Sequence, residues 1–200
     1  PATTVIYTVS LHDALPISGR ESIAHHIHAL SSRAAGPFVN VMLTGLPADE
    51  IEIKFLGREQ EGRVEPGWLD EAREGTLFLN DLTDMLPQVQ QLLLKVLEQG
   101  SYTRVGGRTP QTLELRILSS ARPEIENRVA DGRFRGDLYA RLEGVAVRVP
   151  PLREYREDVP ELLRYYTDAF ADSGDLKYRR FSVAAQNRLR NYPWPGNLRE

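Results

Sequence analysis

The chain has 200 residues, a formal net charge of −3, 41% hydrophobic residues and no cysteine. This length suits one or two compact units, and the lack of cysteine excludes a disulfide scaffold, a cysteine-ligated zinc site and thiol catalysis. The balanced charge excludes a global basic field for nucleic acid, and no apolar run approaches the roughly 20 residues that span a bilayer, so we expect a cytoplasmic protein without a membrane partner.

Residues 1–17 differ in character from the rest of the chain. The stretch IYTVSLHDALPI, residues 6–17, resembles one reading frame of a short-read sequencing adapter. We therefore expect residues 1–17 to be an assembly artefact, to be left out of reasoning about the fold. The alternative is a natural, divergent strand and loop. An uninterrupted native read of the source DNA across this stretch would exclude the artefact.

From residue 18 onward, helices and strands alternate. We predict helices over residues 21–30, 66–72, 87–99 and 134–142, and strands over residues 37–42, 76–79, 113–119 and 145–149. The helix at 87–99 has the clearest pattern, with Pro87 in its first turn, an apolar stripe on one face and Gly100 just past its end. This alternation predicts an α/β fold, a parallel sheet flanked by helices.

After residue 150, no further strands are predicted. Asp158 and Glu161 have the spacing of a capping box for a helix that runs to about residue 171, and Ser182 can cap another helix. We therefore predict an α/β core over residues 18–150 and a small helical subdomain over residues 151–200.

The predicted strand at residues 76–79 ends on two polar side chains, Asn80 and Asp81. In open α/β sheets, the chemistry lies just outside the carboxyl ends of the strands. A buried strand that ends there in two acids would be the metal-binding half of a nucleoside triphosphate site, the Walker B element. Here the first of the two residues is an amide, which indicates weakened chemistry.

Seven segments in chain order carry a resemblance to a known family. They are GRESIAHHIH (19–28), GPFVNV (36–41), EGTLFLNDL (74–82), RVGG (104–107), GRFRGDLYARL (132–142), VPPLREYREDVPELL (149–163) and PWPGNLRE (193–200). Together they resemble the central AAA+ domain of sigma-54-dependent transcription activators, the NtrC-type bacterial enhancer-binding proteins. The resemblance implies an AAA+ P-loop NTPase-like sheet with a helical lid, ATP and Mg²⁺ as cofactors, and self-association as a ring or dimer. It also implies action on sigma-54 RNA polymerase, a sensory domain as in two-component systems, and DNA binding only through a C-terminal helix-turn-helix domain beyond these residues.

By the same resemblance, Gly19, Arg20 and Glu21 match the end of the phosphate-binding Walker A loop. Arg20 stands where the family has lysine, and a planar guanidinium does not replace a compact ammonium at a tight phosphate site. These residues either contact nucleotide phosphate or form a plain helix N-terminus.

Asn80 and Asp81 match the Walker B aspartate and glutamate, which hold Mg²⁺ and polarise the attacking water. Asn80 carries no charge, so we expect weak Mg²⁺ binding. Asp81 is one methylene shorter than glutamate, and such a displacement of a catalytic base can cost about 100-fold in rate. The alternative is that both residues only end the strand and cap the next turn. Arg122 stands at the sensor I position, where the family has an asparagine that helps to orient the water.

Three further arginines match functional positions of the family. Arg135 and Arg141 match the arginine fingers that reach into the neighbouring subunit's site, and Arg199 matches the nucleotide-contacting sensor II of the lid. The alternatives are ion pairs with Asp137 or Glu143 for the first two, and a plain surface charge for Arg199.

The loop with which the family contacts sigma-54, of signature G-A-F-T-G-A, is expected after residues 57–62. Here the chain continues directly into residues 63–67, which match the segment beyond that loop. Two hypotheses remain: an active ATPase that remodels sigma-54 polymerase, or a nucleotide-binding and oligomerisation module with impaired hydrolysis. The missing loop and the substitutions at Arg20, Asn80 and Arg122 favour the second, and ATP turnover is the property that separates the two.

Overall fold

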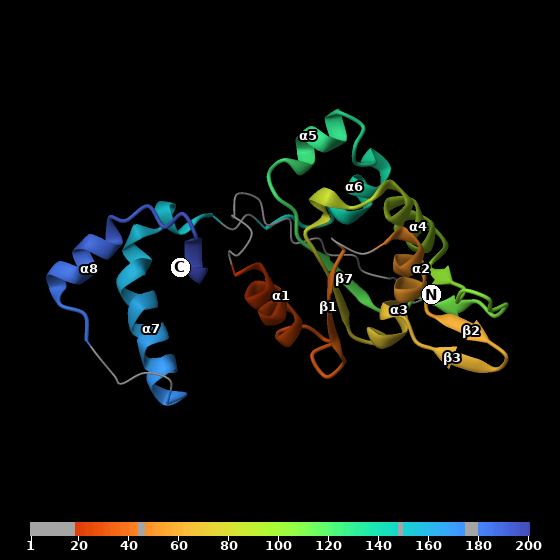
Figure 1. Ribbon diagram of the computed structural model, residues 1–200, viewed down its shortest axis with the longest axis horizontal. Helices are drawn as coiled ribbons and strands as arrows, with labels where there is room; N and C mark the ends of the chain where they lie inside the picture. Colours follow the sequence, from red (N-terminus) through yellow and green to blue (C-terminus); the bar gives the residue numbers. More distant parts are fainter. Residues whose placement is uncertain (1–18, 44–46, 148–149, 175–179) are drawn as a thin grey trace. The chain divides into compact units, whose positions relative to one another are not determined.

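A computed structural model describes residues 19–43, 47–147, 150–174 and 180–200 (Figure 1). The chain divides into two compact units, one over Arg20–Arg148 and the other over Val149–Glu200, with Gly19 grouped with the second. The segment that we predicted to be an artefact, residues 1–17, lies outside the described residues. No helix in the described ranges combines the length and apolar character that a membrane crossing requires.

The first unit is built on a three-stranded parallel sheet of order β1-β4-β7. Its strands are β1 (Phe38–Met42), β4 (Thr76–Asn80) and β7 (Arg116–Ser119). Because all three strands run in the same direction, their carboxyl ends meet at one edge of the sheet, which we call the carboxyl edge. The central strand β4 ends there at Asn80, so the predicted site lies at this edge. The predicted parallel α/β sheet is confirmed.

Six α-helices belong to the described part of this unit, and Figure 1 shows them around the sheet. They are α1 (Arg20–Ala29), α2 (Ala48–Leu56), α3 (Trp68–Glu71), α4 (Pro87–Gln99), α5 (Ile125–Ala130) and α6 (Gly136–Leu142). The shorter elements are the hairpin β2 (Arg58–Gln60) and β3 (Arg63–Glu65), the pair β5 (Ser101–Tyr102) and β6 (Gln111–Thr112), and the 3-10 turn η1 (Leu82–Asp84).

The two faces of β4 pack against different helices because side chains alternate along a strand. Leu77 and Leu79 are fully buried in the main core, together with residues of α2 and α4. On the opposite face, Thr76 Oγ1 lies 2.9 Å from Nδ1 of His28 in α1, and the ring of Phe78 lies 6.1 Å from that of Phe38. Both faces are therefore covered, as buried parallel strands require.

Helix α4 has the bounds that its sequence predicts. Pro87 stands at its start, and Gly100 ends it in a left-handed conformation, φ +62°. The buried side chains Val89, Leu93 and Val96 form the predicted apolar stripe. Local capping and periodicity agree here with tertiary packing, which is why this prediction is accurate.

Two predicted strands need correction. The strand predicted at 113–119 begins only at Arg116; Leu113 and Leu115 are buried, but outside the ladder of β7. The strand predicted at 145–149 is wrong over residues 145–147, where the backbone bends and Val145 is 50% exposed, and residues 148–149 lie outside the described part. Short apolar runs have the same composition in a strand and in a connecting segment, so periodicity could not separate them.

The second unit is helical. Its elements are η2 (Leu152–Glu154), η3 (Arg156–Asp158), α7 (Val159–Asp172), α8 (Val183–Arg190) and η4 (Asn197–Arg199). Ser182 caps α8 as predicted, since its Oγ accepts a hydrogen bond of 3.2 Å from the Ala185 N–H. The predicted capping box at α7 is wrong: Asp158 already has helical backbone angles after η3, and its side chain makes no capping bond.

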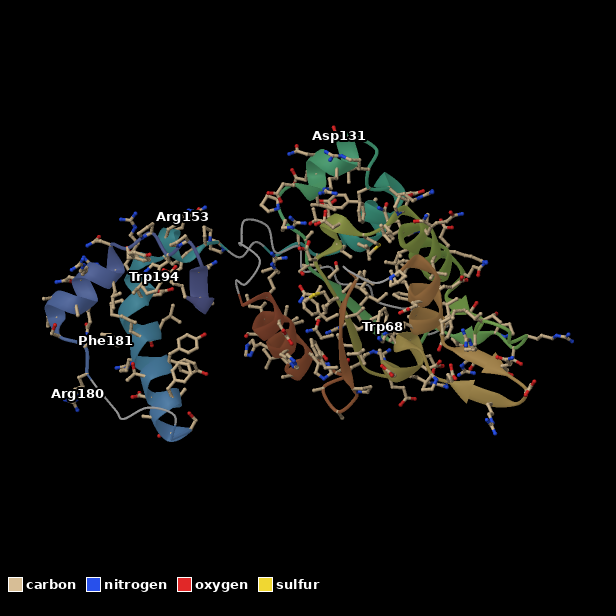
Figure 2. All side chains as sticks on the ribbon, viewed as in Figure 1. Trp68, Asp131, Arg153, Arg180, Phe181 and Trp194 are labelled. Carbon is tan, nitrogen blue, oxygen red and sulfur yellow. The ribbon has the colours of Figure 1, made fainter. Side chains whose placement is uncertain are left out.

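Two partly buried hydrogen bonds hold the end of the second unit. The Asn197 side chain, 2% exposed, accepts a bond of 3.0 Å from the Leu152 N–H. Trp194, labelled in Figure 2, donates from Nε1 to the Leu189 carbonyl at 2.8 Å. The PWPGNLRE segment is therefore fixed to both the first turn of this unit and α8.

Candidate functional site

The two polar residues that end β4 are held by one side chain of the neighbouring strand. The Ser120 hydroxyl, just past β7, donates to Asn80 Oδ1 at 3.1 Å and accepts from the Asp81 N–H at 3.0 Å. Asp81 has φ +62°, a left-handed conformation that is uncommon for residues other than glycine. Sequence reasoning missed Ser120; its position directly after a strand parallel to β4 was the available signal.

The Asp81 carboxylate is occupied by protein donors. Its Oδ1 accepts from the Thr83 N–H at 3.2 Å, and its Oδ2 lies 3.1 Å from Nε of Arg122. The other end of the Arg122 guanidinium contacts Asp84, to which Arg128 of α5 is also paired at 2.7 Å. We call Asp81, Asp84, Arg122 and Arg128 the charged cluster.

Arg122 is fixed by its backbone as well as by its charge. Its N–H donates to Thr83 Oγ1 at 2.9 Å, which anchors the residue beside η1. Burial alone would lower the pKa of the Arg122 guanidinium, but the carboxylates of Asp81 and Asp84 outweigh it and raise that pKa. The guanidinium is therefore a permanent cation at the carboxyl edge.

Arg20, at the start of α1, lies next to the charged cluster. It is only 4% exposed, and burial lowers the pKa of its guanidinium, while the nearby Asp81 and Glu124 act to raise it and Arg122 to lower it. The structure thus brings Arg20 of the predicted Walker A segment near Asp81 of the predicted Walker B pair and near Arg122 at the predicted sensor I position. Glu21 is exposed on α1.

Gly19 precedes Arg20 and has φ +77°, a conformation that strongly favours glycine. A Cβ at this position would lie 3.0 Å from Cδ1 of Leu198, which belongs to the same unit. The position therefore accepts glycine both for its backbone angle and for its limited space.

The donors at the carboxyl edge do not fit Mg²⁺, which favours oxygen ligands, carboxylates above all, in a near-octahedral shell. The carbonyl oxygen of Asn80 is bound by Ser120, and both oxygens of Asp81 are bound by protein donors. Within the described ranges, no group of three histidine, aspartate or glutamate residues could hold a metal ion.

The two predicted arginine fingers both form ion pairs within the unit. Arg135 makes two bonds to Asp137, with Nε–Oδ1 at 3.0 Å and Nη2–Oδ2 at 2.6 Å. Arg141 pairs with Glu98 of α4, at 3.4 Å, and not with Glu143. Both arginine side chains stay more than two fifths exposed, so a competing anion can reach them.

Gln90 positions the segment that carries Arg135, and sequence reasoning missed it. It is 1% exposed on α4. Its Nε2 donates to the carbonyls of Met85 at 2.8 Å and Arg133 at 3.2 Å, and its Oε1 accepts from the Arg135 N–H at 2.8 Å. A buried amide that bonds to backbone has no periodic signature in a sequence, so only the fold reveals it.

Replacing Gln90 with leucine is expected to lower the free energy of unfolding by about 3 kcal/mol, because three backbone groups lose their partner. Chemical denaturation of the full-length protein measures this loss. Gln88→Leu on the exposed side of the same helix is the matched control, with an expected change within about 0.5 kcal/mol. Equal effects of the two substitutions would show that the Gln90 hydrogen bonds contribute nothing.

The backbone of Arg199 lies in η4, and its side chain is outside the described part of the structure. Its predicted role as sensor II therefore stays a prediction.

A tight hairpin stands where the sequence lacks the expected contact loop. Strands β2 and β3 pair from Arg58–Glu65 to Gln60–Arg63, and the two turn residues Glu61 and Gly62 both have positive φ, 53° and 76°. Positive φ at both central positions is typical of a type I′ turn, the closure that suits two twisted strands. The segment is a complete hairpin of minimal length.

A partly buried ion pair fixes the base of this hairpin. Arg104 of the RVGG motif binds Asp70 of α3 through two bonds, Nη2–Oδ1 at 2.6 Å and Nε–Oδ2 at 3.0 Å. The next residue, Val105, accepts from the Glu59 N–H and donates to the Gly57 carbonyl, each at 2.9 Å. The RVGG motif therefore acts here as a support for the hairpin.

The fold and the site define a class of protein, a parallel α/β domain with a charged site at its carboxyl edge, followed by a helical unit. The chain belongs to the Sigma-54 interaction domain family, whose profile matches residues 17–148. The profile of the AAA+ ATPase lid domain matches residues 153–200. The family predicted from the seven motifs is confirmed.

Curated relatives and solved structures are similar to this chain over nearly its whole length. The chain is 40% identical to nitrogen assimilation regulatory protein NtrX of Azorhizobium caulinodans and 38% identical to DNA-binding transcriptional regulator NtrC of Rhizobium meliloti, over 92% of this chain in both cases. It superposes on crystal structures of Brucella abortus NtrX, alone and in complex with ATP, with TM-scores of 0.85, 36% identity and 100% of this chain covered. The chain spans 41% and 39% of the two relatives and 45% and 43% of the two solved chains.

Proposed function

We propose that this domain binds ATP or ADP and self-associates within a cytoplasmic bacterial transcription regulator, and that its ATP hydrolysis is impaired. The observation that carries the proposal is the contact of 3.1 Å between Arg122 and Asp81, at the end of the central strand. Nucleotide binding is supported by the crystal structures of Brucella abortus NtrX in complex with ADP and with ATP.

The contacts of the Asp81 carboxylate support impaired hydrolysis. A catalytic carboxylate must be free to accept a hydrogen bond from the attacking water. Here one oxygen of Asp81 is bound by the Thr83 N–H and the other by Arg122. The preceding Asn80 adds no negative charge for a metal ion, so both functions of the Walker B pair are weakened.

The proposal extends to the organisation of the regulator. We propose residues 18–150 as the nucleotide-binding core, residues 151–200 as its lid and residues 1–17 as foreign sequence. In the full-length protein, DNA contact would come from a separate helix-turn-helix domain, and a sensory domain would receive the signal. The short hairpin at Glu61 and Gly62 leaves no exposed loop of the family's type, so we do not assign a sigma-54 contact to this segment.

The second candidate function is an active ATPase that remodels sigma-54 polymerase. Its support is that Arg135 and Arg141 stand at the family's finger positions and keep exposed guanidinium groups. An arginine supplied by a neighbouring subunit stabilises the charge of the transferring phosphoryl group.

ATP binding and ATP turnover by the purified full-length protein separate the two candidates. We expect saturable binding of ATP and ADP, measured by calorimetry, with phosphate release only slightly above a protein-free blank and unchanged by Arg135→Ala. Turnover that falls on Arg135→Ala would establish the active ATPase instead. Failure to bind either nucleotide would overturn the proposed function.

A further inference from the structure

Arg122 lies between two aspartates at the carboxyl edge. Its guanidinium group is a cation that the protein itself supplies to these carboxylates. One end of its guanidinium lies 3.1 Å from Asp81, and the other contacts Asp84. A metal ion bound by these carboxylates would first have to displace this side chain, which is also held through its backbone by Thr83.

The charges around Asp81 are already balanced. Three negative charges lie close to three positive charges. The acids are Asp81, Asp84 and Glu124, and the arginines are Arg20, Arg122 and Arg128. No uncompensated carboxylate remains in this group to attract a divalent cation, whereas guanidinium groups bind phosphate oxygens through paired N–H donors.

We propose that the site takes a free nucleoside di- or triphosphate without a divalent cation, and that the Arg122 guanidinium stands where the metal ion would. This inference rests on the proposed function, since it presupposes nucleotide binding. It explains three features together: the amide at Asn80, the ion-paired Asp81 and the buried Arg20. Each removes or balances negative charge that a metal ion would need.

The test compares ATP affinity of the full-length protein in excess MgCl₂ and in excess EDTA, by calorimetry. We expect affinities that agree within about 2-fold or are tighter in EDTA. An affinity more than about 10-fold tighter with magnesium would overturn the inference while leaving the proposed function intact. Absence of ATP binding in both buffers would overturn the proposed function, and this inference with it.

A double variant tests whether Arg122 is the residue responsible. Asn80→Asp combined with Arg122→Asn removes the arginine from Asp81 and adds a second carboxylate beside it. ATP should then bind at least about 10-fold more tightly with magnesium than with EDTA. The matched control is Arg133→Asn, which breaks an exposed ion pair outside the charged cluster; its partner, Asp131, is labelled in Figure 2. The control should have the same ratio of ATP affinity with magnesium to ATP affinity with EDTA as the natural protein. A folded double variant that also keeps this ratio would show that Arg122 does not replace the metal ion.

Discussion

The triple variant Asn80→Asp, Asp81→Glu and Arg122→Asn is expected to hydrolyse ATP about 100-fold faster than the natural full-length protein. The first change supplies a carboxylate for Mg²⁺, and the second restores the reach of the catalytic base. The third removes the guanidinium that now lies 3.1 Å from Asp81. Phosphate release at saturating ATP and magnesium measures the gain.

Two further variants show whether the gain has the expected origin. Asn80→Asp alone should leave turnover unchanged, because Arg122 still occupies the neighbouring carboxylate. Arg135→Ala added to the triple variant should remove the gain, since a finger arginine supplies much of the stabilisation of the transferring phosphoryl group. A full gain from Asn80→Asp alone would contradict the role given to Arg122.

Replacing Phe78 with alanine is expected to lower the free energy of unfolding of the first unit by about 3–5 kcal/mol. Phe78 is fully buried in the middle of β4, and its ring lies 6.1 Å from that of Phe38. Phe38 in turn stacks at 3.9 Å on His25 of α1, the helix that begins with Arg20. The cavity would therefore weaken the packing of the helix that brings Arg20 to the site.

Urea denaturation followed by circular dichroism measures this loss of stability. Val64→Ala on the hairpin is the control, because Val64 is 50% exposed and its truncation should cost no more than about 0.5 kcal/mol. A loss below 1 kcal/mol for Phe78→Ala, roughly the cost of a surface change, would show that the α1 face of the sheet is not part of the cooperative core.

The elements that the sequence predicted well are those whose local pattern agrees with their packing. Helix α4 has its capping residues and its apolar stripe, and β4 is an apolar run that ends in polar residues. The segment at 145–147 has the same apolar character, yet Val145 and Val147 are exposed. Composition alone does not show which apolar residues are buried by packing, so the strand predicted over residues 145–147 was wrong.

The candidate site was predicted only as far as single positions allow. Asn80 and Asp81 could be located from the end of one strand, but their partners come from other elements. Ser120 lies beside them because β7 pairs with β4, and Arg122 reaches Asp81 because it follows β7 by only three residues. These contacts between side chains of different elements depend on the order of strands in the sheet, which a single sequence does not reveal.

The hairpin at Glu61 and Gly62 also makes this domain a suitable acceptor for loop grafting. A Cβ added at Gly62 would meet no atom within 4 Å, while the base of the hairpin is held by Arg104 and Asp70. Lengthening a surface loop costs little, about 0.6 kcal/mol for each doubling of its length. A contact loop from an NtrC-type relative, inserted between Glu61 and Gly62, would therefore be displayed on an intact scaffold. Sigma-54 contact and nucleotide binding would then be separate parts of the domain that can be engineered one at a time.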